Sequence, residues 1–510
     1  MAVGEEGVVS QSADEVGVPP DTAPLARQTL AYGLSGLIAP LVGLITLPVF
    51  ARAFTQGQYG LLELGTTTST VALALTDVGL TAAMLRSFYD YRADEEPERQ
   101  SVMRTGLVAT TTCALALAGL MILFRGEIAS RILQRPGEES LVVLIAASVV
   151  ALNTWRFVSE VMRVRLLAFN YLATTLLAAS ITTVLGVVGV LVLDWRVNGV
   201  FLAAVIGNGI AAAYGVAVIR SSLAGRFSGS HLRRMLAFGL PLVPATLASW
   251  ALALVDRIIL ARLGSLAQVG EYAIANRLAS LLTIGMTAFL FALTPFLFAT
   301  YSEDPTQEKA ARGRTLTYLT FVLALGGLVL TLFAHEILSL IAPRFESAYK
   351  AVGPLMLGML AYGLVTLLAT GIALARSTGR GALLTVLAAG INIGLNFALI
   401  PPYGVVGAAF ATTIGYGFLA IGYYLLSQHL YPTPYEPGKA LLTIGAASAF
   451  GVLGAVGLGP EALAVLVKLG AIAGFVLVIW GTGTMRQGEF AELKRFLFGM
   501  IPLRFRRAGA

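Results

Sequence analysis

Four basic side chains lie inside stretches of sequence that are otherwise apolar. They are Arg156, Arg257, Arg277 and Lys468. A bare charge at the middle of a bilayer costs on the order of several kcal/mol, so such residues face a water-filled cavity or an opposite charge. A guanidinium group also offers paired donors that suit the oxygens of a diphosphate. We therefore expect the three arginines to bind an anionic substrate, whereas Lys468 is expected to reach the membrane surface with its amine.

A structural role is the alternative for two of these arginines. Asp256 precedes Arg257, and Glu271 lies six residues before Arg277. Either acid could pair with an arginine as a structural latch, or the arginine side chains could extend to the membrane interface. The sequence leaves substrate binding and these structural roles open.

Three acidic residues complete the set of candidates. Glu160 lies four residues after Arg156, on the same helical face, so the two could neutralise each other until a substrate phosphate competes for Arg156. Asp77 has no basic residue three or four positions away on either side. A carboxylate that faces a cavity can bind a coupling ion, H⁺ or Na⁺, which is the role we expect for Asp77 and, with less support, for Glu63. Helix capping or contact with cytoplasmic water is the alternative for Asp77.

The elements that carry these residues are long apolar helices. Of 510 residues, 57% are hydrophobic and 12% are charged, against about 25% charged in soluble proteins. A hydrocarbon core of about 30 Å needs roughly 20 apolar residues per helix, and fourteen such stretches are present. Their cores are 29–51, 60–84, 104–124, 141–162, 169–193, 199–219, 237–260, 271–298, 314–334, 352–375, 381–400, 405–426, 439–458 and 461–482. The composition excludes a soluble multidomain enzyme and predicts an all-α integral membrane protein.

The basic residues predict the orientation of the chain. With the N-terminus inside, 23 of the 35 Lys and Arg residues fall in cytoplasmic segments and 8 fall outside. Positive loops stay inside, so both termini are predicted to be cytoplasmic. The predicted units are a disordered acidic tail (1–27), a six-helix N-lobe (28–220), a cytoplasmic linker (221–235), a six-helix C-lobe (236–427), a final helix pair (438–482) and a basic cytoplasmic tail (486–510).

An internal repeat relates the two lobes. The pattern Ala51-Arg52 with Gln58-Tyr59-Gly60 reappears 210 positions later as Ala261-Arg262 with Gln268-Val269-Gly270. A second match, at an offset of 205, relates residues 198–204 to residues 403–409. Duplicated six-helix blocks have the same orientation, so we expect two lobes related by an axis along the membrane normal, as in transporters that rock around a central site.

Two segments resemble polysaccharide flippases. Residues 255–276, which contain Val255-Asp256-Arg257-Ile258-Ile259-Leu260, resemble the region between the seventh and eighth helices of these proteins, and Asn392–Ala409 is similar to the signature of their eleventh and twelfth helices. Over about 28–430 the chain resembles the Wzx-type oligosaccharide flippases of the multidrug/oligosaccharidyl-lipid/polysaccharide exporter superfamily. The resemblance implies two six-helix lobes that form a V around a central cavity, with an extra C-terminal helix pair. It also implies alternating-access transport of polyprenyl-diphosphate-linked sugar units to the outer leaflet of a bacterial or archaeal cytoplasmic membrane.

Other functions receive less support from the sequence. A lipid II flippase shares the span count and an anionic substrate, and a cation-coupled multidrug exporter is the other alternative within the superfamily. The chain contains no G-x-x-x-x-G-K-[ST] motif for ATP, its three histidines are scattered, and it has a single cysteine, Cys113. We therefore expect no enzyme activity, cofactor, metal or nucleic acid. The expected partners are membrane lipids, the lipid-linked glycan and a coupling ion.

Overall fold

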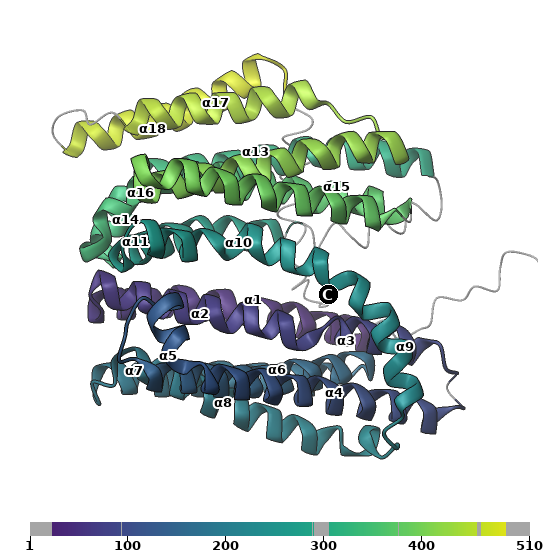
Figure 1. Ribbon diagram of the computed structural model, residues 1–510. Coiled ribbons are helices and arrows are strands. Elements are labelled where there is room, and N and C mark those ends of the chain that lie inside the picture. Colours follow the sequence, from purple (N-terminus) through teal and green to yellow (C-terminus); the bar gives the residue numbers. More distant parts are fainter. Residues whose placement is uncertain are drawn as a thin grey trace, which may run out of the picture.

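A computed structural model describes residues 23–92, 94–287, 289, 305–375, 377–455 and 461–485. Long helices run roughly side by side and stack in layers (Figure 1). The helices near the N-terminus form the purple and blue layers, the following helices form the teal and green layers, and α17 and α18 form the outermost yellow layer. Residues 1–22 of the predicted tail 1–27 and the whole predicted tail 486–510 lie outside the described residues. The first helix begins at Ala23, inside the segment 1–27 that was predicted to be a tail.

The first eight helices pack mainly against one another, and we call them the N-lobe. They are α1 (Ala23–Ala53), α2 (Gln56–Asp77), α3 (Leu80–Tyr89), α4 (Glu96–Leu123), α5 (Arg125–Glu127), α6 (Glu139–Val164), α7 (Ala168–Leu191) and α8 (Arg196–Val218). Helix α9 (Gly229–Gly239) then connects this group to the rest of the chain (Figure 1).

The helices that follow α9 form a second group, which we call the C-lobe. They are α10 (Val243–Leu263), α11 (Leu266–Ala279), α13 (Pro305–Leu332), α14 (Ala334–Ile341), α15 (Tyr349–Leu374) and α16 (Thr378–Leu430). Two further helices, α17 (Pro437–Ala455) and α18 (Glu461–Gly481), pack on the C-lobe through α13. Contacts between the two lobes are made mainly by α2, which packs against α10 and α11.

The helices confirm the predicted all-α membrane fold. Among the described residues, nine helices are long and apolar enough to span a membrane, or ten if α2 and α3, which are bent by 40°, form one span. Each of the fourteen predicted stretches overlaps a described helix. Helix α16 contains two of the predicted stretches, 381–400 and 405–426. Gly404 (φ 53°), which follows Pro401 and Pro402, breaks the helix between them. Its halves then run side by side, and the hydroxyl of Tyr423 donates to the carbonyl of Gly381 at 3.3 Å.

The internal repeat coincides with two helix starts. Thr55 caps α2: its side chain accepts from the backbone N–H of Gln58, and the Gln58 side chain accepts from the Thr55 N–H. At the equivalent place, Ser265 caps α11 by accepting from the N–H of Gln268. A side-chain cap satisfies backbone donors that the first helical turn leaves unpaired. The repeated pattern thus fixes where the two helices begin.

The same repeat brings the backbones of α2 and α11 into contact. A Cβ atom added at Gly60 would lie 1.9 Å from the carbonyl oxygen of Leu266, and one added at Gly270 would lie 2.3 Å from that of Gln56. Only glycine fits at such a close approach. The two equivalent glycines therefore pack the lobes together at one end of the interface, which we call the Gly60 end.

A second close backbone contact lies at the opposite end of α2, between the N-lobe and the connecting helix α9. Val78 and Gly79, with φ of 47° and 70°, form the break between α2 and α3. A Cβ atom added at Gly79 would lie 2.6 Å from the carbonyl oxygen of Gly239, at the end of α9. We call this the Gly79 end. Close backbone contacts thus lie at both ends of α2, to α11 at the Gly60 end and to α9 at the Gly79 end.

The final helix pair is attached to the C-lobe by an ion pair. The amine of Lys468 on α18 binds the carboxylate of Glu336 on α14 and lies 5.5 Å from the ring centre of Phe333. Lys468, which was expected to reach the membrane surface, is thus buried and paired with Glu336. Burial opposes ionisation of Glu336, but the hydrogen bond from Lys468 prevails, and the pKa of Glu336 lies below its ordinary value.

Candidate functional site

Arg257 lies in a buried cluster of charges between the lobes. Its Nε atom donates to Glu63 Oε1 of α2 at 3.0 Å, and its Nη1 atom donates to Asp256 Oδ1 at 2.7 Å. The side chain is only 3% exposed. Buried charges need such partners, because an uncompensated charge in a medium of low dielectric is costly. The pair with Glu63 crosses from one lobe to the other.

Asp256 connects this arginine to two more helices. Its Oδ2 atom accepts hydrogen bonds from the hydroxyl of Tyr272 on α11 and from Thr412 Oγ1 on α16, the latter at 3.2 Å. Arg257 also lies 5.2 Å from the ring centre of Tyr272. The C-lobe thus holds Asp256 and Arg257 as one rigid unit, and Glu63 is the part of the cluster that the N-lobe contributes.

Arg277 lies at the edge of the same cluster. Its Nη2 atom is 3.8 Å from Glu63 Oε2, and its guanidinium group lies 5.6 Å from the ring centre of Tyr59. Unlike Arg257 it is partly exposed, and it lines a cavity of about 230 Å³ between α1 and α11. We name the set of Glu63, Asp256, Arg257, Tyr272, Arg277 and Thr412 the interlobe cluster.

The interlobe cluster shows how the candidate residues at this level are paired. The latch expected between Asp256 and Arg257 is present, with Glu63 as an additional partner. Glu271 takes no part, since it accepts instead from Gln56 and Ser347. In this conformation Arg257 has no room for a substrate. Its use in binding would require the lobes to separate.

A polar cavity of about 350 Å³ lies between α2, α3 and α6 of the N-lobe and α10 of the C-lobe. It collects two of the predicted site residues, Asp77 and Arg156. The polar and aromatic part of its lining consists of Asp77, Thr81, Asn153, Arg156, Phe157, Glu160, Arg163, Thr246 and Trp250. We call this space the interlobe cavity.

Arg156 is the unpaired cation of the interlobe cavity. Its side chain is exposed, and no carboxylate of the described chain lies within 4 Å of it. The sequence suggested a pair with Glu160, which is wrong, because Glu160 binds Arg163 at 2.8 Å on the next turn. Positions three and four residues apart are both within reach on a helix. The pairing of Glu160 with Arg163 leaves Arg156 available to a ligand.

Asp77 caps a helix and also lines the interlobe cavity. Its Oδ1 atom accepts from the backbone N–H of Thr81 at 3.2 Å and from the Thr81 hydroxyl, so it caps the start of α3. It also lines the interlobe cavity. The capping alternative is therefore present, and the carboxylate remains open to the space that Arg156 faces.

Sequence reasoning missed three residues of this cavity. Arg163 was assigned to a loop, but α6 continues to Val164 and carries it to the cavity. Asn153 is 4% exposed, and its Nδ2 atom has no hydrogen-bond partner in the described chain, although its Oδ1 accepts from Thr76. Trp250 faces these residues from α10. Asn153 and Arg163 lie at helical spacing from Arg156, three residues before it and seven after it, and this was the available signal for these two, whereas Trp250 comes from another helix.

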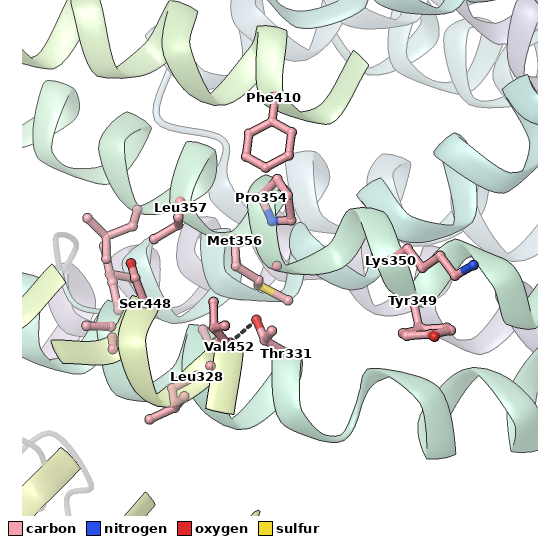
Figure 2. Close-up of a pocket in the computed structure, with 17 residues that line it drawn as sticks. Leu328, Thr331, Tyr349, Lys350, Pro354, Met356, Leu357, Phe410, Ser448 and Val452 are labelled. Atoms are coloured by element: carbon pink, nitrogen blue, oxygen red, sulfur yellow. Dashed lines mark hydrogen bonds between the residues drawn. The ribbon is translucent and has the colours of Figure 1, made fainter. Parts of the chain in front are cut away.

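A further cavity, of about 290 Å³, differs in character. It lies between α13, α15, α16 and α17, and its lining is almost wholly apolar (Figure 2). Its one charged residue is Lys350, whose amine points away from Leu328, Met356 and Val452 (Figure 2). None of the predicted site residues lines it. The candidate site for a charged substrate is therefore the interlobe cavity.

The fold defines an all-helical, multi-pass membrane protein. The family described as "Polysaccharide biosynthesis protein" matches residues 25–301, and the chain belongs to this family. Among curated proteins, no sequence matches this chain.

Solved structures support the same fold. The lipid II flippase MurJ in an inward closed conformation has a TM-score of 0.67 and 14% identity, with 90% of this chain and 100% of that chain covered. An inward-facing multidrug resistance MATE family transporter of the MOP superfamily has a TM-score of 0.64 and 15% identity, with 76% and 94% covered. A MOP superfamily transporter from Pyrococcus furiosus, described as having a binding pocket of reverse polarity, has a TM-score of 0.56 and 14% identity, with 79% of this chain and 94% of that chain covered. At these identities the likeness shows the fold alone.

Proposed function

We propose that this protein is a flippase that moves polyprenyl-diphosphate-linked oligosaccharides across the membrane by alternating access. The family relates the chain to polysaccharide biosynthesis, and the neighbouring folds are those of transporters. The observation that carries the proposal is the unpaired guanidinium group of Arg156 inside the interlobe cavity. A guanidinium group without a carboxylate partner offers paired donors that suit the oxygens of a diphosphate.

Two further side chains fit the sugar part of such a substrate. The free amide of Asn153 is a buried donor, and a buried donor without an acceptor is costly. An oxygen of the substrate would satisfy it. Trp250 offers a flat apolar face beside these polar groups, as aromatic residues do in ligand sites. Arg156 would thus contact the diphosphate, while Asn153 of the N-lobe and Trp250 of the C-lobe would contact the sugars.

The two ends of the interface suggest how access alternates. At the Gly60 end, glycine contacts and the interlobe cluster close the path. For a substrate to leave there, the hydrogen bond between Glu63 and Arg257 must break while Asp256 remains with Arg257. The separated cluster would then expose Arg257 and Arg277 to the passing diphosphate, and protonation or Na⁺ binding at Glu63 or Asp77 would favour the opened state.

The basic residues of the loops determine the orientation that we propose. The Gly79 end carries the connections around α3, α4 and α9, which belong to the arginine-rich side of the chain. By the positive-inside rule this end faces the cytoplasm. The protein would then lie in the cytoplasmic membrane with both termini inside, take substrate from the Gly79 end and release it at the Gly60 end.

Lipid II is the second candidate substrate, because the lipid II flippase MurJ shares the fold over its whole length. Lipid II also carries a diphosphate, so Arg156 would bind it in the same way. A cationic drug fits less well, since the free guanidinium group of Arg156 would repel it.

The proposal is tested by Arg156→Gln in proteoliposomes. A fluorescent polyprenyl-diphosphate oligosaccharide and a fluorescent lipid II are compared as substrates. Arg156→Gln should lower the rate of flipping at least about tenfold, the effect of losing one charge-assisted hydrogen bond. Arg131→Gln is the matched control, because Arg131 pairs with Glu127 on the surface. If the Arg156→Gln variant flips both substrates at the wild-type rate, the proposed role of this arginine is refuted.

A further inference from the structure

A second polar cavity lies between the end of α3 and helix α9, and it shares no lining residue with the interlobe cavity. It has a volume of about 360 Å³ and is lined by Arg86, Ser87 and Asp90 from the N-lobe side, and by His231, Arg234 and Phe238 from α9. Arg86 and Arg234 bring two guanidinium groups to it. Neither has a carboxylate within 4 Å in the part of the chain that the structure describes.

Each guanidinium group contacts one side chain of α9. Arg86 lies 4.6 Å from the ring centre of Phe238, a cation–π contact. Arg234 Nη2 is 3.3 Å from His231 Nδ1. Since an arginine can only donate, Nδ1 accepts, and the imidazole is neutral with its proton on Nε2. That nitrogen donates to Glu98 at 2.9 Å.

The buried imidazole is therefore a fixed support for Arg234. His231 is 5% exposed and is held on one side by Glu98 and on another by the ring of Tyr91, at 5.7 Å between centres. Glu98 is thus engaged by His231, and Arg86 and Arg234 have no carboxylate within 4 Å among the described residues. Preorganised, unpaired guanidinium groups are the donors that bind phosphate best.

The other polar residues of the lining favour a ligand that carries hydroxyl groups as well as a phosphate. Asp90 is an acceptor and Ser87 carries a hydroxyl, and neither forms an ion pair with the two arginines. A bare phosphate would be repelled by Asp90. A phosphate ester with neighbouring hydroxyl groups would satisfy both halves of the pocket, since its hydroxyls can donate to Asp90 while its phosphate accepts from the arginines.

The position of the pocket along the membrane normal fits a lipid headgroup. The span that contains α9 and α10 runs from Gly229 to Leu263, 35 residues, which is about 52 Å at 1.5 Å per residue. A hydrocarbon core is about 30 Å thick, so this helix projects beyond it and α9 reaches the headgroup layer. Basic pockets between helices at this level bind anionic headgroups.

We propose that Arg86 and Arg234 bind the phosphate of a hydroxyl-bearing phosphate ester at the junction of α3 and α9. A phospholipid with a glycerol headgroup and the sugar-diphosphate end of a lipid-linked glycan both have this chemistry. Because α9 links the lobes, the bound headgroup joins the N-lobe to the segment that leads into α10. The site does not depend on which substrate crosses the interlobe cavity.

The test is native mass spectrometry of the whole protein with short-chain lipids. Dihexanoyl phosphatidylglycerol, dihexanoyl phosphatidic acid, dihexanoyl phosphatidylcholine and farnesyl-diphosphate-N-acetylglucosamine are titrated separately. Arg86→Gln and Arg234→Gln should each weaken binding of phosphatidylglycerol, of the sugar diphosphate or of both about tenfold. Arg233→Gln is the control, because Arg233 is an exposed neighbour that does not line the pocket.

The ligand that shows this dependence on the arginines identifies the source of the phosphate. Asp90→Asn provides a second readout: it should reduce the preference for phosphatidylglycerol over phosphatidic acid while the variant still binds phosphate. The proposal is overturned if Arg233→Gln loses as much affinity as the other two variants, if phosphatidylcholine binds as tightly as both hydroxyl-bearing ligands, or if neither hydroxyl-bearing ligand depends on Arg86 and Arg234. None of these readouts requires transport, so they are separate from the test of Arg156.

Discussion

Substituting alanine at Gly60 should open the Gly60 end of the interface. The added Cβ atom would lie 1.9 Å from the carbonyl oxygen of Leu266, and relief to an ordinary contact of about 3.5 Å requires a separation of about 1.6 Å. Backbone atoms cannot rotate away as a side chain can, so α2 and α11 must move apart. The same movement would stretch the hydrogen bond between Glu63 and Arg257 from 3.0 Å beyond its useful range.

The expected size follows from the cost of overpacking. Inserting a methyl group into a well-packed contact costs about 1–3 kcal/mol, and only the closed state pays this cost. The ratio of open to closed molecules should therefore rise by a factor of about 5 to 150.

The assay is the distance between two spin labels on opposite lobes. Labels are placed at Arg131 and Leu340, two exposed positions near this end, in a protein whose only cysteine, Cys113, is replaced. Gly60→Ala should shift the distance distribution to longer values. Gly57→Ala is the control on the same helix, since its Cβ atom would meet only the Arg135 side chain, at 3.6 Å. If the two variants give the same distribution, the close packing of α2 on α11 is refuted.

Three other predictions concern the charged and aromatic contacts. Glu63→Gln should also lengthen the distances at the Gly60 end, because Arg257 loses its partner in the other lobe, and unchanged distances would show that this bond does not hold the lobes together. Glu336→Gln should lower the stability by up to about 1 kcal/mol at neutral pH. The lowered pKa of Glu336 means that the contribution of its pair with Lys468 is present at neutral pH and is lost as the pH falls through that pKa, so thermal unfolding should show a difference between wild type and variant that disappears in acid. Trp250→Ala should weaken binding of the sugar-bearing substrate several-fold while binding of farnesyl diphosphate stays unchanged, and an equal loss for both ligands would contradict a sugar contact.

The comparison of sequence and structure is clearest at the helix starts. Thr55 and Ser265 each stand three residues before a glutamine, and both patterns are helix caps, as the local chemistry of these residues favours. The spans follow in the same way from length and apolarity, because a backbone in lipid must satisfy its own hydrogen bonds and a helix does so locally. The presence of arginines within these spans was also readable from the chain.

The partners of those arginines were decided by the tertiary structure. Glu63 is 194 residues from Arg257, and no spacing rule connects the two. Glu160 has Arg156 and Arg163 within reach on the same helix, and in the folded chain it pairs with Arg163. The sequence by itself therefore determined the helices, their caps and the charges that need partners, since these depend on neighbours along the chain. Which charges are paired, and that Arg156 is not, depends on how the two lobes pack, because the pairing energy of a charge is set by what surrounds it in space.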